Sequence, residues 1–240
     1  MRHNNRKIDQ LRTLHIEPNY VKYAEGSCLI SIGNTKVLCT ASYDKKVPLF
    51  LRNQGSGWVT AEYSLLPRST VTRCAREVKQ GKQSPRTVEI QRLISRALRA
   101  ALNLQMLPEC QIIVDCDVIQ ADGGTRTASI IGGYVALNLA INNLMKQNIL
   151  LRDPRLEQIG AISCGIVKGL PMIDLDYAED SNAAVDANII FNKRGQIVDI
   201  QATAEKGSFS KAELDSMIQL VEKNINFIFE AQNKALSQNA

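Results

Sequence analysis

The run DCDVIQADGGTRTASI at residues 115–130 decides the fold that we expect for this chain. Its first part belongs to a β run, QIIVDCDVIQ at 111–120. The loop ADGGTRT follows and leads into an uncharged helix. Glycines let backbone N–H groups converge, and a helix N-terminus carries about half a positive charge. The run therefore predicts an α/β chain whose loop can hold an anion.

Two α/β stretches extend outward from this run and meet near Asp153-Pro154. The first has a hairpin at about 27–43 and a helix from Ser84-Pro85 to about Gln105, with a polar, basic stretch at 52–86 between them. The second reads as a set of strands followed by a long helix, which Ser210 and Glu213 introduce as a capping box. These strands are expected at about 159–168, 171–177, 186–193 and 196–204, and the helix from about 211.

Composition places the chain among ordinary globular proteins. It has 240 residues, a mass of 26.6 kDa, 45% hydrophobic and 22% charged residues. These values support a buried core and exclude global disorder, a collagen-like fibre and a disulfide miniprotein. The formal net charge of +5 and the pI of about 8.9 permit an anionic partner without requiring one.

Neither export nor a membrane anchor is expected. The N-terminal stretch MRHNNRKIDQLR lacks the apolar core of a secretory signal. The uncharged run from Thr127 to Met145 approaches the length of a membrane span, but its asparagines and Gly132-Gly133 favour a helix buried in a protein core. Six cysteines without a CxxC pair are typical of free thiols in a reducing cytoplasm. The expected hairpin turns at Gly33-Asn34, which places Cys28 opposite Cys39.

The basic excess of the chain is local. Residues 68–99 hold nine Lys or Arg and two acids, so this segment carries +7 and the rest of the chain −2. A loop such as PRSTVTRCAREVKQGK, at 67–82, repels itself unless it meets a polyanion. With only 5% aromatic residues for base stacking, we expect this basic loop to track a nucleic-acid backbone. A solvated charged face is the alternative, above all for Arg92, Arg96 and Arg99.

Two arginines stand where a helix dipole repels them. Arg126 lies at the start of the helix after the glycine loop, and Arg86 comes directly after Ser84-Pro85. An anion held between them resolves both conflicts, so the pair predicts a phosphate site. A chance Gly-Gly turn beside an exposed arginine is the alternative.

Five carboxylates fall within thirteen residues that contain no Lys or Arg. Carboxylates without basic partners indicate a hard divalent cation such as Mg²⁺, which would also let RNA phosphates approach. A solvated turn at 179–182 is the alternative. The carboxylates belong to Asp174, Asp176, Glu179, Asp180 and Asp186, and the first two are expected on one face of a strand.

Segments spread over residues 5–235 resemble the ribonuclease PH family of phosphate-dependent 3′-to-5′ exoribonucleases. The opening run is the most specific of them. The others are DQLR (9–12), AEGS (24–27), KVLCTA (36–41), FLRNQGSGWVTAEYSLLPRST (50–70), EIQRLISRALRA (89–100) and DLDYAEDSNAAVDAN (174–188).

The resemblance implies an α/β (α+β) fold of two βαβα-like halves packed as one compact subunit, like ribosomal protein S5 domain 2. Residues 1–150 would carry the basic loop and the GGTR phosphate loop, and residues 151–240 the acidic cluster and the C-terminal helix. It also implies a cytoplasmic homo-hexamer, a trimer of dimers without a membrane, that trims the 3′ ends of tRNA precursors and other RNAs.

The resemblance assigns a role to each group of charged residues. Asp180 and Asp186 are the implied catalytic and Mg²⁺-binding carboxylates. Inorganic phosphate, the co-substrate, falls on Arg86, Gly124, Thr125 and Arg126. RNA binding falls on Arg68, Arg73 and Arg76 in the basic loop, which also carries Lys79 and Lys82.

The expected reaction is attack of phosphate on the last phosphodiester of an RNA, with release of a nucleoside diphosphate. Asn188 stands where related polynucleotide phosphorylases have Lys, which agrees with ribonuclease PH. A non-catalytic RNA-binding ring subunit is the alternative, since it needs the basic loop but no carboxylates. A hydrolytic nuclease is a weaker rival because it gives no reason for Arg86 and the GGTR loop.

Overall fold

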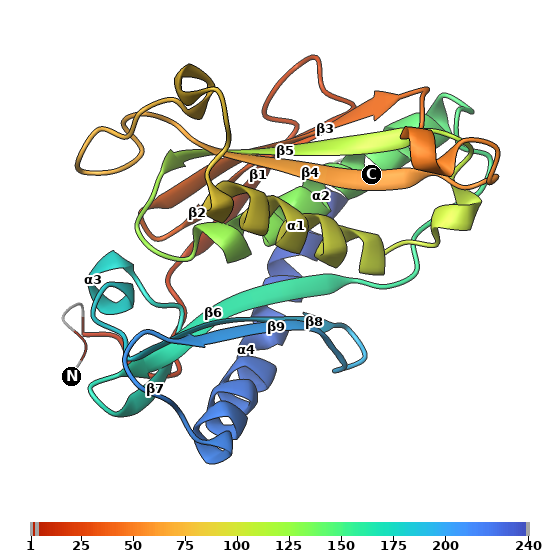
Figure 1. Cartoon of the computed structure of the whole chain (residues 1–240). Helices are drawn as coiled ribbons and strands as arrows, with labels where there is room; N and C mark the ends of the chain where they lie inside the picture. Colours follow the sequence, from red (N-terminus) through yellow and green to blue (C-terminus); the bar gives the residue numbers. More distant parts are fainter. Residues whose placement is uncertain (1, 3–4, 239–240) are drawn as a thin grey trace.

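Two β-sheets form the framework of the chain in the computed structural model, which describes residue 2 and residues 5–238 (Figure 1). The first sheet has the strand order β1-β2-β3-β5-β4, and its β4–β5 pair is parallel while the others are antiparallel. Parallel neighbours need a crossover, which α1 (Pro85–Ala100) supplies. The strands are β1 (Leu14–Pro18), β2 (Gly26–Ile32), β3 (Thr35–Asp44), β4 (Trp58–Leu65) and β5 (Gln111–Gln120).

The second sheet is antiparallel throughout and has the order β7-β6-β8-β9. Its central strand β6 is buried at every position, because helices cover both of its faces. A one-turn helix, α3 (Tyr177–Asp180), connects β7 to β8. The strands are β6 (Ile159–Val167), β7 (Leu170–Ile173), β8 (Val185–Asn192) and β9 (Ile197–Ala204).

Helices α1 and α2 (Thr125–Lys146) lie between the two sheets, and α4 (Lys211–Ser237) packs against the second sheet and α2 (Figure 1). In the described chain one helix, α2, is long and apolar enough to cross a membrane, and 83% of that stretch is buried inside the protein. The expectation that this run forms a core helix is confirmed.

Local signals predicted several elements correctly. The hairpin pairs Cys28 with Cys39, and all six cysteines are free thiols. Ser84 caps α1 with Pro85 at its first position, and Ser210 and Glu213 form the capping box of α4. The mixed α/β fold class is also confirmed.

Other expectations were wrong. The polar stretch at 52–86 contains the strand β4, and α1 ends at Ala100 rather than near Gln105. Asp174 and Asp176 do not share a strand face. Strand β7 ends at Ile173, Asp174 has a positive φ of 51°, and Asp176 is the N-cap of α3.

Candidate active site

The glycine loop that joins β5 to α2 forms one wall of the site. Gly123 and Gly124 have φ values of 74° and 68°, in the left-handed region that favours glycine. A Cβ on Gly123 would lie 2.4 Å from the Leu175 carbonyl oxygen, so the loop packs directly on the segment before α3. Among the described residues, no side chain caps the N-terminus of α2. Its first N–H groups are therefore available to an anion.

Arg126, in the first turn of α2, faces carboxylates from two other elements. Its Nη2 lies 2.7 Å from Glu89 Oε2 on α1, and its Nη1 lies 3.8 Å from Asp186 Oδ2 on β8. Its Nε is buried and has no hydrogen-bond partner among the described residues. Beside it, the Tyr63 hydroxyl lies 2.9 Å from Thr125 Oγ1. Arg126 thus has a donor left over, at the position where the sequence predicts a phosphate.

Asp180 and Asp186 come together from the end of α3 and the start of β8, close enough for each carboxylate to affect the pKa of the other. Burial, and next the charge of Asp180, raise the pKa of Asp186 to about 6. Burial also raises the pKa of Asp180, while the charges of Arg86 and Arg126 act in the opposite direction. Arg86 is exposed, but its charge reaches both carboxylates. The structure thus brings the predicted phosphate loop, both arginines and both carboxylates to one place.

The other three predicted carboxylates, of Asp174, Asp176 and Glu179, form ion pairs with arginines of the N-terminal segment. They are therefore not free to bind a metal ion. Arg12 Nη2 lies 2.7 Å from Asp174 Oδ1, Arg6 reaches Asp176 at 3.5 Å, and Arg2 pairs with Glu179. The expectation of an acidic cluster without basic partners is therefore wrong for Asp174, Asp176 and Glu179. These arginines lie more than 160 residues away along the chain, outside the window in which the cluster was counted.

The remaining pair of carboxylates suits a magnesium ion. The described residues contain no group of three or more His, Cys, Asp or Glu side chains that could hold a metal. Mg²⁺ nevertheless often binds through one or two carboxylates and completes its shell with water and substrate phosphates. Asp180 and Asp186 fit that pattern and leave open positions for an RNA.

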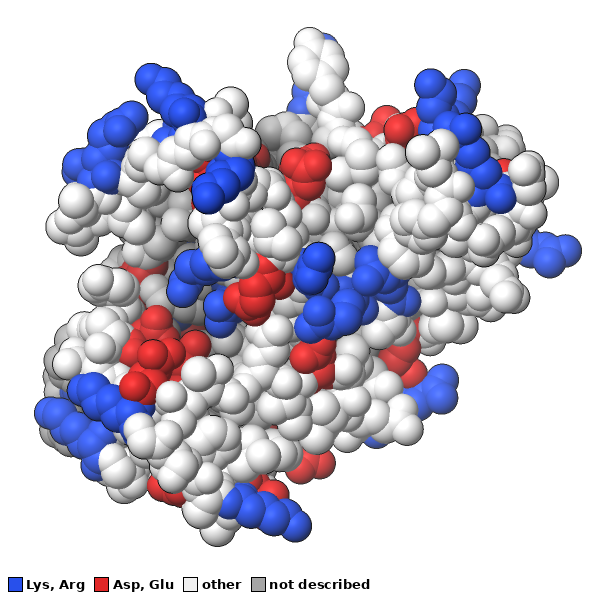
Figure 2. All heavy atoms as spheres, viewed as in Figure 1, with Lys and Arg blue, Asp and Glu red and all other residues white. Residues whose placement is uncertain are grey.

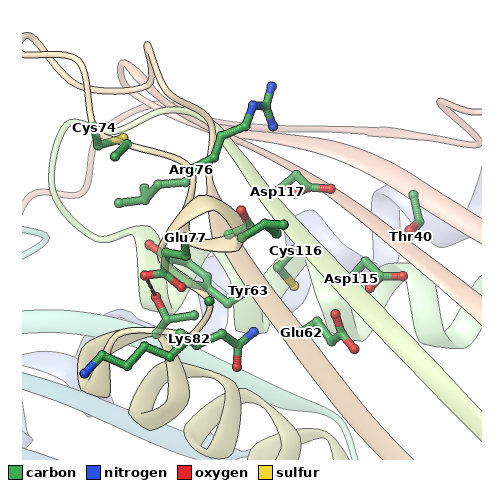
Figure 3. A pocket seen from close by; sticks show the side chains of 17 residues that line it. Thr40, Glu62, Tyr63, Cys74, Arg76, Glu77, Lys82, Asp115, Cys116 and Asp117 are labelled. Atoms are coloured by element: carbon green, nitrogen blue, oxygen red, sulfur yellow. Dashed lines mark hydrogen bonds between the residues drawn. The ribbon is translucent and has the colours of Figure 1, made fainter.

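The basic loop overhangs the outer face of β4 and β5 beside the site. Arg68, Arg73, Arg76, Lys79 and Lys82 are all exposed. Thr87 on α1 donates a hydrogen bond to Glu77 at 2.7 Å, which ties the loop to the start of that helix. Figure 3 shows this bond, with Arg76 and Lys82 pointing in opposite directions.

Beneath this loop lies a hollow of about 740 Å³ with an acidic floor. Glu62, Asp115 and Asp117 line it from the two strands (Figure 3). Burial, followed by the charge of Glu62, raises the pKa of Asp115. RNA phosphates are repelled by such a floor, so the outer rim of the loop is the part that suits RNA.

A groove runs between α1 and β9 and begins at the site. A hollow of about 430 Å³ contains Arg126, Asp186 and Gln201, and a neighbouring one of about 470 Å³ contains Arg92 and Gln201. Figure 2 shows basic and acidic side chains side by side along this boundary. Arg96 closes its far end by pairing with Asp199 at 2.9 Å. Sequence reasoning gave Glu89 and Gln201 no role at the site, because only the packing of α1 on the second sheet brings them here.

Three aromatic residues precede the basic loop in the sequence, and of these Phe50 is exposed while Tyr63 is buried. Trp58 makes an edge-to-face contact with Phe50 and lies 4.3 Å from the Arg99 guanidinium, which stacks on it. Tyr63 is 4% exposed. Each of these three residues therefore has a partner within the protein.

Comparison with known proteins identifies the class. Two family models match, the 3′ exoribonuclease family domain 1 over residues 10–141 and domain 2 over residues 157–223. Ribonuclease PH of Cereibacter sphaeroides is 54% identical over 236 residues, which cover 98% of this chain and 100% of the relative. Ribonuclease PH of Caulobacter vibrioides is also 54% identical, with coverages of 98% and 99%.

Solved structures share the fold at lower identity. Rice (Oryza sativa) Rrp46 has a TM-score of 0.80 at 20% identity and covers 98% of this chain and 100% of its own. The Archaeoglobus fulgidus exosome with RNA bound to the active site has a TM-score of 0.80 at 21% identity, with coverages of 95% and 91%.

The chain belongs to the 3′ exoribonuclease family. Its full-length relatives at 54% identity are ribonucleases PH, and the chain is accordingly a 3′-to-5′ exoribonuclease that uses phosphate as co-substrate. The resemblance stated from the sequence is confirmed.

Proposed function

We propose that this enzyme phosphorolyses the 3′ ends of tRNA precursors and other RNAs with the residues gathered around the glycine loop. Arg86, Arg126 and the backbone of Gly124 and Thr125 hold inorganic phosphate. The observation that carries this assignment is the buried, unpartnered Nε of Arg126 beside the uncapped N-terminus of α2. Arginine suits the role, because its planar fork matches two phosphate oxygens at once.

The reaction then consists of one in-line displacement. An oxygen of the bound phosphate forms a bond to the phosphorus of the last phosphodiester, and the bond from that phosphorus to the 3′ oxygen breaks. The terminal nucleotide leaves as a nucleoside diphosphate, and the shortened RNA keeps its 3′ oxygen as a hydroxyl after taking up a proton. Arg126 and Arg86 orient the attacking phosphate and neutralise its charge.

Asp180 and Asp186 would hold Mg²⁺ through their carboxylate oxygens. When bound, the ion supplies charge stabilisation for the departing 3′ oxygen. Glu89 keeps the Arg126 guanidinium in place through the 2.7 Å contact. Its remaining donors are then directed toward phosphate.

The finer partners are part of the same proposal. Arg68, Arg73, Arg76, Lys79 and Lys82 contact the RNA backbone upstream of the scissile bond, and their exposure supports that role. The enzyme acts in the cytoplasm as a homo-hexamer, a trimer of dimers. Residues 1–150 and 151–240 act as its two halves, the first with the phosphate loop and the second with the carboxylates.

Omission of phosphate tests the reaction. RNA with a tRNA-like 3′ end is incubated with enzyme and Mg²⁺, with and without inorganic phosphate, and the released nucleotides are identified. We expect nucleoside diphosphates with phosphate and no turnover without it. Nucleoside monophosphates would indicate a hydrolytic nuclease, and no turnover under either condition would indicate a non-catalytic RNA-binding ring subunit.

A further inference from the structure

Arg12 lies behind the glycine loop and binds it from the side opposite the proposed phosphate. The arginine is buried, and its Nε and Nη2 donate to the Asp174 carboxylate at 2.7–3.1 Å. Its Nη1 donates to the Asp122 carbonyl at 2.5 Å, and its Nη2 to the Gly123 carbonyl at 3.3 Å. One guanidinium therefore joins the N-terminal segment, the segment before α3 and the glycine loop.

These contacts determine which way the loop presents its N–H groups. In a trans peptide the carbonyl of one residue and the N–H of the next point in opposite directions. The chain has no cis peptide bond among its described residues. Holding the Asp122 and Gly123 carbonyls toward Arg12 therefore turns the N–H groups of Gly123 and Gly124 away from it, toward the side of Arg126.

A second side chain, Thr35 on β3, also binds the Gly123 carbonyl. Thr35, at the start of β3, donates its hydroxyl to the Gly123 carbonyl at 2.6 Å and accepts the Asp122 N–H at 3.0 Å. Thr35 is fully buried. The loop is thus fixed from behind by two buried side chains, Arg12 and Thr35.

The site needs an arginine here for a geometric reason. Arg12 uses three nitrogens on three carbonyls and a carboxylate, which lie in the glycine loop and in the segment before α3. Lysine offers a single ammonium that cannot span these acceptors with a planar fork. An Arg12→Lys change keeps the positive charge beside Asp174 and loses the orientation of the loop.

We propose that Arg12, oriented by Asp174, is a positioning residue for phosphorolysis, which aligns the loop N–H groups on inorganic phosphate by holding the Asp122 and Gly123 carbonyls. Thr35 is its partner in this role. The inference rests on the phosphate site proposed at Arg126 and deepens it. Neither residue touches the reacting atoms, so both act through the loop.

Steady-state kinetics of Arg12→Lys and Thr35→Val test the proposal. A loosened loop raises the KM for phosphate about tenfold, while kcat at saturating phosphate and the Kd for RNA change by less than about threefold. In the reverse, polymerising direction the KM for a nucleoside diphosphate rises in parallel, because its terminal phosphate occupies the same pocket. A residue that only stabilised the fold would not separate the KM for phosphate from the affinity for RNA.

A matched control is Arg155→Lys, which removes another arginine fork, paired with Asp153 and Asn142 away from the site. Its KM for phosphate is expected to stay at the wild-type value. Should Arg12→Lys not fold, as judged by circular dichroism, Thr35→Val carries the test alone. An unchanged KM for phosphate in the folded variants would overturn the positioning role.

Arg126→Ala separates this inference from the proposed function. If Arg126→Ala retains the wild-type KM for phosphate, the phosphate site itself is misplaced and the inference falls with it. If Arg126→Ala loses phosphate-dependent turnover while Arg12→Lys and Thr35→Val behave as wild type, the phosphate site stands and only the positioning role is wrong.

Discussion

Asp186 illustrates at the residue scale how a buried carboxylate of the proposed active site lowers the stability of the fold. Its pKa of about 6 lies above the ordinary value of 3.8, because it is buried and faces Asp180. The folded state therefore holds this proton more tightly than the unfolded state, and stability falls as pH rises between about 4 and 6. This rise in the pKa of Asp186 lowers the free energy of unfolding at pH 7 by about 3 kcal/mol.

The Asp186→Asn variant removes that penalty. In EDTA we expect it to be more stable than wild type at pH 7.5 by about 1–3 kcal/mol, with the difference disappearing near pH 4. Urea denaturation at several pH values measures this. Addition of Mg²⁺ is expected to stabilise wild type more than the variant, and a stability difference that is independent of pH would contradict the argument.

Among the elements, the basic loop and the glycine loop are expected to separate binding from chemistry. Arg73→Ala together with Arg76→Ala removes two exposed cations, so RNA binding weakens. The slope of log affinity against log salt concentration becomes shallower by about 0.7–0.9 for each lost phosphate contact. Arg126→Ala abolishes turnover and spares most RNA affinity. Fluorescence anisotropy with labelled RNA over a range of salt concentrations tests both, and an equal loss of affinity in the two variants would argue against the division.

Helix α2 depends on close packing against the first sheet. A Cβ at Gly132 would lie 2.7 Å from Cys39 Sγ and 2.8 Å from Ile30 Cγ2, both fully buried. Overpacking of this kind costs about 1–3 kcal/mol, while replacing a helical glycine by alanine gains at most about 1 kcal/mol. Gly132→Ala is therefore expected to lower the free energy of unfolding. Gly133→Ala, whose nearest contact would be 3.3 Å, is the control and should be nearly neutral in thermal denaturation.

The elements that sequence reasoning found are those specified by neighbouring residues. The Gly33-Asn34 turn fixed the hairpin register, and Ser210 with Glu213 fixed the start of α4. Strand β4 was missed because it lies within a polar, basic stretch and its parallel partner β5 begins more than 40 residues later. The acidic cluster was misread for the same reason, since the arginine that neutralises Asp174 is distant in sequence. Strand β4 and the ion pairs of the acidic cluster both depend on residues far apart in the sequence. A pattern read over neighbouring residues does not include those partners.

On the scale of the whole molecule, the two halves share one core. A single hydrophobic cluster includes Ile30 from the first sheet and Ile189 from the second. Gln232 on α4, fully buried, donates hydrogen bonds to the carbonyls of Ile131 on α2 and Ile159 on β6. The Arg12–Asp174 pair ties the N-terminal segment to the second half as well. The helices between the sheets thus contact both sheets.

A shared core predicts one cooperative unfolding transition rather than two. Far-UV circular dichroism reports both halves, whereas fluorescence of Trp58, the one tryptophan of the chain, reports β4 in the first sheet. The two probes should give coincident urea transitions at two protein concentrations, because neither half keeps its core without the other. For the same reason a fragment of residues 1–150 is expected to bind the dye ANS and to melt without cooperativity. Separate transitions, or a fragment that melts cooperatively, would show that the first half folds as an independent domain.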